Sequence, residues 1–233
     1  MTLRQILATI ALLLTATLAG AQDDPQYRWE IGAGVDMVSY EGDFNGNITK
    51  NMKPGGSLLL RRVFNPFMGL RLNAMYGKLK GSSTDVKTYY PDFQETPYEF
   101  DNTLIDVSMT YEYNFWPYGT GRDYREAKRI TPFFFGGFGV TYVKYGTDVN
   151  GKSNAFTANV PIGLGIKYKI GERVNLGLEW AIHFSLSDEL DGVKDPYHVE
   201  SSGAFKNTDC YSAFQLSLTY SFGPKCQTCN KDF

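Results

Sequence analysis

Residues 160–186 read VPIGLGIKYKIGERVNLGLEWAIHFSL, and this stretch sets the pattern for the whole chain. Apolar side chains occupy every second position on both sides of a short break: Val160, Ile162, Leu164, Ile166, Tyr168, Ile170, Val174, Leu176, Leu178, Trp180, Ile182 and Phe184. The positions between them carry Gly163, Gly165, Lys167, Lys169, Asn175, Gly177, Glu179 and His183. A period of two predicts β-strands with one apolar and one polar face, and residues 171–173 suit a tight hairpin turn. Each arm has about the 9–11 residues that a tilted strand needs to cross a bilayer.

The same alternation recurs in six further segments, so the sequence predicts eight strands. The expected strands cover about 27–40, 56–64, 67–79, 103–116, 130–145, the two arms of the opening hairpin, and 211–223. An even number of antiparallel strands fits the smallest class of outer-membrane barrel. The predicted fold class is therefore all-β, an eight-stranded antiparallel transmembrane β-barrel. Three consecutive leucines, Leu58–Leu60, leave open whether Arg61 or Arg62 faces inward.

The connections between the expected strands alternate in length. Two connections after even-numbered strands are tight, at Asn65–Pro66 and at residues 171–173. Those after odd-numbered strands are longer, at about 41–50, 81–102, 146–154 and 188–209. With both termini in the periplasm, the long loops would be extracellular, as such barrels normally have them. The charged connection Pro117–Arg129 is the exception, because it is long for a periplasmic turn.

The N-terminus has the pattern of a secretory signal peptide. Arg4 precedes a short apolar run, which ends at Ala19-Gly-Ala21. A positive start, a short apolar core and an Ala-x-Ala site are typical of a cleaved export signal. We therefore expect residues 1–21 to be removed, 22–223 to form the outer-membrane barrel and 224–233 to form a periplasmic tail.

Composition agrees with a membrane barrel but does not prove one. Aromatic residues make up 15% of the chain and glycines number 24, as expected for interfacial aromatic girdles and a crowded lumen. A formal net charge of -2 gives no indication of nucleic-acid binding. A soluble β-sandwich remains the alternative, with Asp106, Glu112, Lys167 and Glu179 on its solvent face. Strand length and aromatics near the strand ends favour the barrel.

In a barrel, the polar face of each strand points into the lumen. The charged residues predicted to face inward are Glu30, Asp36, Arg71, Asp106, Glu112, Lys167, Lys169 and Glu179. An eight-stranded lumen is only wide enough for side chains, and an unpaired buried charge is costly. We therefore expect these charges to pair and fill the lumen, with no pore. A proton or ion path is the alternative role for them.

The sequence offers little for catalysis. His183 is expected on the inward face, and His198 lies in the last long loop near Asp195 and Glu200. A Ser-His-Asp arrangement stays open in principle, but nothing in the sequence places its members together. We predict no enzyme activity, no cofactor and no metal site.

The chain has three cysteines. Cys210 begins the last expected strand at its outer end, and Cys226 and Cys229 lie beyond the other end, in the tail. A strand of about a dozen residues, at roughly 3.3 Å each, exceeds the reach of a disulfide of about 7 Å between Cα atoms. Cys226 and Cys229 are expected to pair with each other or to form an intermolecular disulfide with a partner. A non-reducing gel that shows only monomer, with no thiol free to label, would remove the intermolecular alternative.

Several segments resemble a known barrel family. The matching segments are Tyr40-Glu-Gly-Asp43, residues 70–77 (LRLNAMYG), residues 111–119 (YEYNFWPYG), residues 131–139 (TPFFFGGFG) and the opening hairpin continued through Asp188-Glu-Leu-Asp191. Together they resemble the small outer-membrane barrels around PorG, a component of the Bacteroidetes type IX secretion system. The resemblance covers about Tyr27 to Gly223, and the hairpin is its most specific part.

The resemblance implies a non-enzymatic role in protein secretion. A barrel of this family would anchor or position the periplasmic ring of PorK and PorN at the outer membrane, surrounded by its lipid. Such a contact would lie on periplasmic features of the chain. The candidate contact residues there are Arg122, Arg125, Arg129, Cys226 and Cys229.

Three other roles remain open at this point. The long loops 81–102 and 188–209 could bind host or matrix as a surface adhesin. The chain could also be a structural outer-membrane barrel with no part in secretion. A lipid-modifying barrel enzyme would need a His, a Ser and an acid clustered at one rim.

Overall fold

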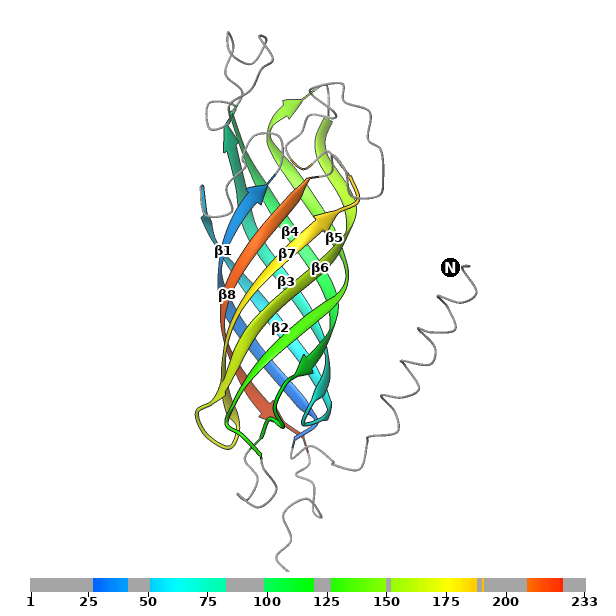
Figure 1. The fold of residues 1–233 in the computed structure, drawn as a ribbon. Coiled ribbons are helices and arrows are strands. Elements are labelled where there is room, and N and C mark those ends of the chain that lie inside the picture. The colour runs from blue at the N-terminus through cyan, green and yellow to red at the C-terminus, as the bar shows by residue number, and fades with distance from the viewer. Residues whose placement is uncertain are drawn as a thin grey trace, which may run out of the picture.

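The chain forms a closed barrel of eight antiparallel strands (Figure 1). The computed structural model describes residues 27–41, 51–82, 99–119, 127–149, 152–187, 190 and 209–223. The strands are β1 Trp29–Glu41, β2 Lys53–Asn65, β3 Met68–Ser82, β4 Glu99–Asn114, β5 Ile130–Val149, β6 Lys152–Lys169, β7 Val174–Ser185 and β8 Cys210–Phe222. Each strand pairs with the next in sequence, and β8 pairs with β1. The predicted fold class is confirmed.

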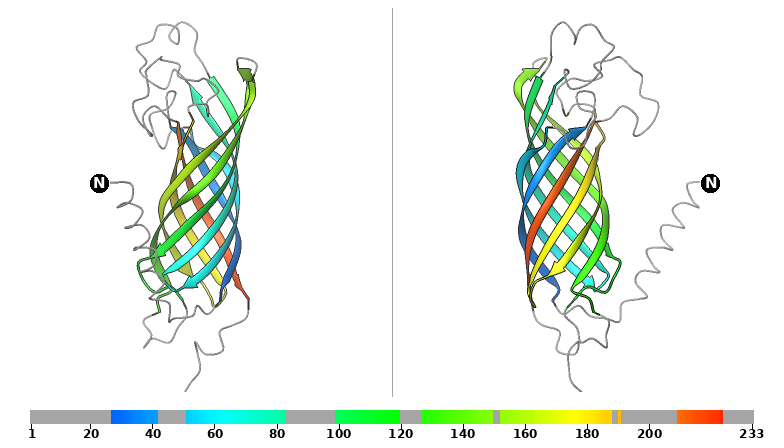
Figure 2. Two further views of the ribbon diagram at one scale, coloured as in Figure 1. Left: turned by 90° about the vertical axis from the view of Figure 1, so that its right-hand side faces the viewer. Right: turned by 60° about the vertical axis from the view of Figure 1, so that its left-hand side comes forward.

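The seam between β1 and β8 closes the barrel. It runs in register from Trp29 opposite Phe222 to Glu41 opposite Cys210. The start of β1 and the end of β8 therefore lie at the same end of the barrel, together with the tight turns after β2 and β6 (Figure 2). We call this the turn end and the opposite one the loop end.

The strands at the loop end are longer than the sequence predicts. β2 begins at Lys53 and β4 at Glu99, and the expected loop at 146–154 is wrong, because β5 runs to Val149 and β6 starts at Lys152. The glycine, aspartate and asparagine of this segment are typical of loops, yet its backbone pairs across the two strands, with Val149 opposite Lys152. The connection after β5 is therefore short rather than long.

The two faces of the wall are inverted relative to a soluble protein. Large apolar side chains on the outward positions are exposed, for example Phe138 (78%), Leu58 (67%) and Leu164 (61%). The inward positions of the same strands carry buried polar and charged side chains. A soluble sandwich would bury its apolar face, whereas this arrangement is that of a barrel in a bilayer. No helix among the described residues is long and apolar enough to cross a membrane.

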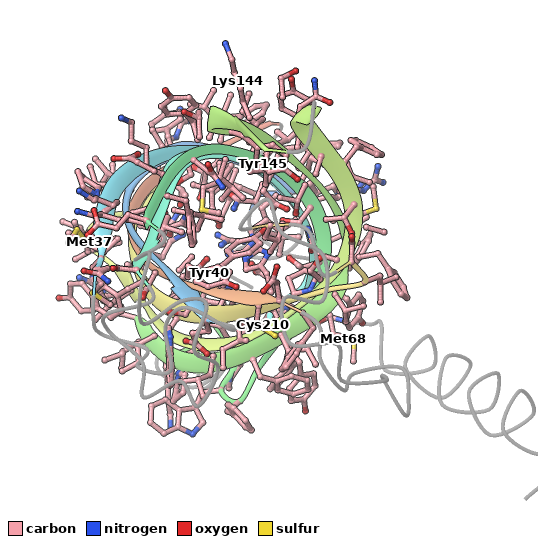
Figure 3. All side chains as sticks on the ribbon, turned by 90° about the horizontal axis from the view of Figure 1, so that it is seen from above. Met37, Tyr40, Met68, Lys144, Tyr145 and Cys210 are labelled. Atoms are coloured by element: carbon pink, nitrogen blue, oxygen red, sulfur yellow. The ribbon has the colours of Figure 1, made fainter. Side chains whose placement is uncertain are left out.

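The structure shows which side chains of β2 face the lumen. Leu59 and Arg61 point into the lumen, where both are buried, and Leu58, Leu60 and Arg62 point outward and are exposed. Figure 3, which views the barrel from above, shows the same alternation on another strand. There Tyr40 lies inside the ring of strands, and Met37 points away from it.

Two aromatic side chains fill the lumen where β5 and β6 meet. Phe133 and Phe135 are buried and stacked, with 5.7 Å between their ring centroids. They lie opposite Gly165 and Gly163 in the β5–β6 register. An added Cβ at Gly163 would lie 2.4 Å from the Phe135 ring, so each ring occupies the space that a side chain on β6 would need.

Candidate functional site

An ion-pair network fills the part of the lumen nearer the turn end. Its centre is Glu112 on β4, which receives cations from three other strands. Arg61 Nε lies 2.7 Å, Arg71 Nε 3.3 Å and Lys167 Nζ 2.5 Å from the Glu112 carboxylate oxygens. All four side chains are almost fully buried. One carboxylate is therefore shared by three buried cations, and further negative charge is needed to balance them.

Two further carboxylates balance the network. Glu30 pairs with Arg61, and Glu179 lies 2.5 Å from Arg71 Nη1. Together the network has three cations and three carboxylates. Arg71 also lies over the Phe135 ring, and Lys167 lies over the Phe133 ring. The charges are thus paired with one another and packed against the aromatic layer.

Five of the eight predicted lumen charges belong to this network: Glu30, Arg71, Glu112, Lys167 and Glu179. Sequence reasoning missed Arg61, because the three consecutive leucines before it hid the alternation. Asp36 instead accepts a hydrogen bond from Gln215, at 2.7 Å. Asp106 and Lys169 are likewise bonded to polar neighbours, described below.

The connection after β4 closes the turn end. Tyr118 pairs with Lys128 as an isolated bridge, and its hydroxyl donates to Asn175 Oδ1 at 3.0 Å. Lys169 donates to the same oxygen at 3.0 Å, and its ammonium lies 5.5 Å from the centre of the Tyr118 ring. The long charged connection thus places an aromatic side chain, Tyr118, across the turn end of the lumen; we call it the plug. Burial raises the pKa of the Tyr118 phenol above its usual value, and nearby Glu30 and Glu112 add to the rise.

This plug predicts a pH dependence. A raised folded-state pKa means that folding favours the protonated phenol, so stability falls as pH rises above about 10, where a free tyrosine ionises. Tyr118→Phe should therefore lose less stability than wild type between about pH 10 and 12. Chemical unfolding in detergent at several pH values measures this slope. Equal slopes for wild type and Tyr118→Phe would contradict the assignment.

A polar cluster occupies the middle of the lumen. Asp106 accepts hydrogen bonds from Tyr211 at 2.9 Å, Thr141 at 3.0 Å and Asn159 at 2.5 Å. The imidazole of His183 stacks on the Tyr211 ring, with 3.0 Å between Nδ1 and the hydroxyl. All five side chains are buried, so the cluster holds β4, β5, β6, β7 and β8 together rather than facing a substrate.

An apolar layer closes the loop end. Its members are Val38, Tyr40, Met75, Leu79, Phe100, Leu104, Val143, Tyr145, Ala155, Leu190, Tyr211 and Ala213. Leu190 comes from beyond β7, and its backbone is fixed by Asn102 Nδ2 on the carbonyl at 3.0 Å and by Asp209 on the amide at 2.9 Å. A residue outside the strands, Leu190, therefore helps to close this end, as Tyr118 does at the turn end.

Little space is left inside. One cavity beside Arg71, His183 and Gln215 has a volume of about 10 Å³, and another beside Glu30 and Arg61 has about 20 Å³. Either volume suits about one water molecule. Among the described residues there is no group of three His, Cys, Asp or Glu side chains that could hold a metal ion. In the described part of the barrel, side chains fill the lumen, and His183 is buried among them.

Of the predicted contact residues, Arg129 lies at the turn end, and the others lie outside the residues that the structure describes. Arg129 is exposed at the rim, and its carbonyl accepts a hydrogen bond from the Lys169 amide at 2.7 Å. Arg122, Arg125, Cys226 and Cys229 lie outside the described residues, as does His198. Cys210 is the first residue of β8, at the loop end.

Comparison with solved structures finds other small outer-membrane barrels. Neisserial surface protein A matches with 11% identity and a TM-score of 0.48, over 83% of this chain and 97% of that one. The attachment invasion locus protein Ail of Yersinia pestis matches with 11% identity and a TM-score of 0.46, over 85% and 99%. The outer membrane protein OprG of Pseudomonas aeruginosa matches with 11% identity and a TM-score of 0.45, over 87% and 99%.

Comparison at the level of sequence gives the family. No curated protein matches the chain. One family model matches residues 4–231, which is nearly the whole chain. The chain therefore belongs to the family described as "Domain of unknown function (DUF6089)".

Proposed function

We propose that this protein is an integral outer-membrane barrel that anchors a periplasmic assembly of the type IX secretion system. The observation that carries this proposal is the closed lumen, with Glu112 and its three cations in one part and an apolar layer in another. A barrel without a passage can act only through its outer wall and its two ends. A structural, non-enzymatic role agrees with a closed lumen and with contacts made only at the wall and the ends.

The resemblance to the PorG family gives this role its partners. The ring proteins PorK and PorN would contact the periplasmic end of the barrel. We assign that end to the turn end, because short turns in such barrels face the periplasm. The described part of the connection Pro117–Arg129 could present such a contact, since Tyr118 fixes one arm to Asn175 and the Lys169 amide fixes the other arm to the end of β6. A fixed connection holds its exposed Arg129 in a defined place for a partner.

Affinity purification from native membranes tests this proposal. The tagged wild type should bring down PorK and PorN, and the triple variant Arg122→Gln, Arg125→Gln, Arg129→Gln should lose most of both. The matched control is Lys78→Gln, Lys80→Gln, Lys144→Gln, which removes three cations at the loop end and should behave as wild type. Each variant must first show the folded, heat-modifiable band on a gel.

Other results would redirect or reject the proposal. Ring proteins absent from the wild-type eluate would reject the secretion role. A surface ligand that binds wild type and is lost after proteolytic shaving of the loop end would favour the adhesin instead. An intermolecular disulfide through Cys226 or Cys229 predicts a covalent adduct with a ring protein on a non-reducing gel, which a Cys226→Ser, Cys229→Ser variant should lack.

A further inference from the structure

The described part of the turn-end rim carries an excess of exposed positive charge. Five exposed cations lie there: Arg28, Arg62, Lys128, Arg129 and Arg173. Among the described residues of this rim, the single exposed acid is Glu172. At the loop end, by contrast, cations such as Lys78 stand beside acids such as Asp101, 3.7 Å away. Among the residues that the structure describes, the excess of exposed positive charge therefore lies at the turn end.

Three of these cations gather at the barrel seam. Arg62 lies 5.2 Å from the Trp29 ring centre, and Arg173 lies 5.2 Å and 5.9 Å from the rings of Tyr27 and Tyr220. Trp29 stands opposite both Arg62 on β2 and Phe222 on β8 in the register, and Arg28 precedes it. We call Arg28, Arg62 and Arg173, with these aromatic partners, the seam patch.

The guanidinium of Arg173 is held in a fixed orientation. Its Nε donates to the Tyr27 hydroxyl at 3.3 Å and its Nη1 to the Tyr220 hydroxyl at 2.9 Å. These contacts raise the pKa of Arg173 further, so the group stays charged. A guanidinium has five N–H donors, and phosphate oxygens are ligands that it binds in a bidentate manner. The two tyrosines therefore orient the remaining donors without consuming them.

The patch lies at the edge of the apolar wall. Two positions further along the same strands, Ile31, Leu60 and Leu218 are exposed and begin the apolar band. Tyrosine and tryptophan at such an edge sit at the level of lipid headgroups. The cations stacked on them are therefore at the depth of the lipid phosphates.

A similar pair lies on the opposite side of the barrel. The Lys128 ammonium lies 4.7 Å from the Trp116 ring centre, beside the β4–β5 connection, four strands away from the seam. A partner protein docking from one side would not require paired cations on both sides. A ring of lipids around the barrel would contact both.

We infer that the turn-end rim binds the headgroups of anionic phospholipids, and that the seam patch is the principal site. The ligand is the phosphodiester of a lipid in the leaflet that this rim faces. The basis is the charge of the rim, the orientation of Arg173 and the position of the patch beside the apolar band. The inference does not depend on a role in secretion.

The test uses the full-length protein in mixed micelles of detergent with phosphatidylglycerol or phosphatidylcholine, read by native mass spectrometry. Wild type should retain phosphatidylglycerol with a preference of roughly tenfold or more, because each cation near an anionic headgroup adds about fivefold. Arg28→Gln, Arg62→Gln, Arg173→Gln should lower the preference at least about fivefold relative to wild type, with Lys128 and Arg129 keeping the remainder. Lys78→Gln, Lys80→Gln, Lys144→Gln should keep it. The Arg→Lys version of the seam variant should fall between, because lysine keeps the charge without the fork.

Three outcomes would overturn the inference. Wild type could retain the two lipids equally, or the seam variant and the loop-end control could lose the preference to the same extent. The seam variant could also keep its lipid preference and lose a co-purifying protein, which would make the patch a protein contact. A heat-modifiable band for every variant shows that none of these outcomes reflects misfolding.

Discussion

Glu112→Gln is expected to destabilise the folded barrel by about 3–5 kcal/mol, the usual cost of breaking a buried ion pair from one side. The change removes the charge that Arg61, Arg71 and Lys167 share, while all three cations stay buried. Glu30 and Glu179 remain as partners of the two arginines, but Lys167 loses its carboxylate partner and is left with neutral contacts, among them the amide oxygen of Asn114 at 3.1 Å and the Phe133 ring. Urea unfolding in detergent, followed by tryptophan fluorescence, measures the loss.

The control for this prediction is Glu172→Gln. Glu172 lies in the exposed turn after β6 and should change the free energy of unfolding by less than about 0.5 kcal/mol. If Glu112→Gln unfolds at the wild-type urea concentration, then Glu112 does not hold the lumen together. A second variant, Glu112→Gln with Lys167→Met, should recover part of the loss, because it removes the cation left without a carboxylate.

Gly163→Val is expected to destabilise the barrel, because its side chain would enter space that other groups occupy. Its Cβ would lie 2.4 Å from the Phe135 ring and 2.6 Å from the carbonyl oxygen of Trp180. The ring is enclosed by the lumen and the carbonyl belongs to the neighbouring strand, so neither can move away without disturbing the wall. Overpacking of this kind costs about 1–3 kcal/mol, and the backbone contact favours the upper end.

Gly171→Val is the matched control for that change. Nothing lies within 4 Å of a Cβ at Gly171, and the residue is in the turn that follows β6. Its unfolding midpoint in urea should stay close to wild type, while that of Gly163→Val falls. Equal midpoints for the two variants would show that Phe135 does not occupy the space above Gly163. If the prediction holds, the double variant Gly163→Val, Phe135→Leu should recover part of the stability that Gly163→Val loses, since the smaller side chain frees that space.

The barrel could be predicted from sequence because its wall obeys one simple rule. Each strand faces lipid on one side and a polar lumen on the other, so side chains alternate along it. The rule gave the number of strands, their direction and most of the inward residues. It failed at Leu58–Leu60, where an apolar residue also faces the lumen, and so it did not place Arg61.

The strand ends could not be predicted in the same way. Between Gly146 and Asn154 the residue types are those of a loop, but β5 runs to Val149 and β6 begins at Lys152, and these two residues are paired. Pairing of this kind depends on the neighbouring strand and not on the local residue types. The residues that close the two ends could not be predicted either, because Tyr118 and Leu190 lie in connections and reach the lumen only through tertiary contacts.

Pairing within the lumen was likewise beyond the sequence. Period-two alternation places Asp106 and Lys169 on the inward face, but it does not say which strand lies across from them. In the folded barrel, Asp106 is surrounded by the hydroxyls and amide of Tyr211, Thr141 and Asn159, and Lys169 reaches Asn175. These are hydrogen bonds to neutral groups rather than ion pairs. The distinction follows from the shear of the barrel, which only the strand register reveals.

Conductance across a planar bilayer tests the closed lumen most directly. Purified wild-type protein is inserted into the bilayer, and resistance of its strands to protease confirms insertion. It should give no steady conductance above that of the bare membrane. The reason is that the ion-pair network, the Asp106 cluster and the Leu190 layer fill the described part of the lumen, where the cavities beside Arg71 and Glu30 each hold about one water molecule. Stable, ohmic channel steps from the wild-type protein would contradict the account, because they would require a continuous passage where the structure has packed side chains.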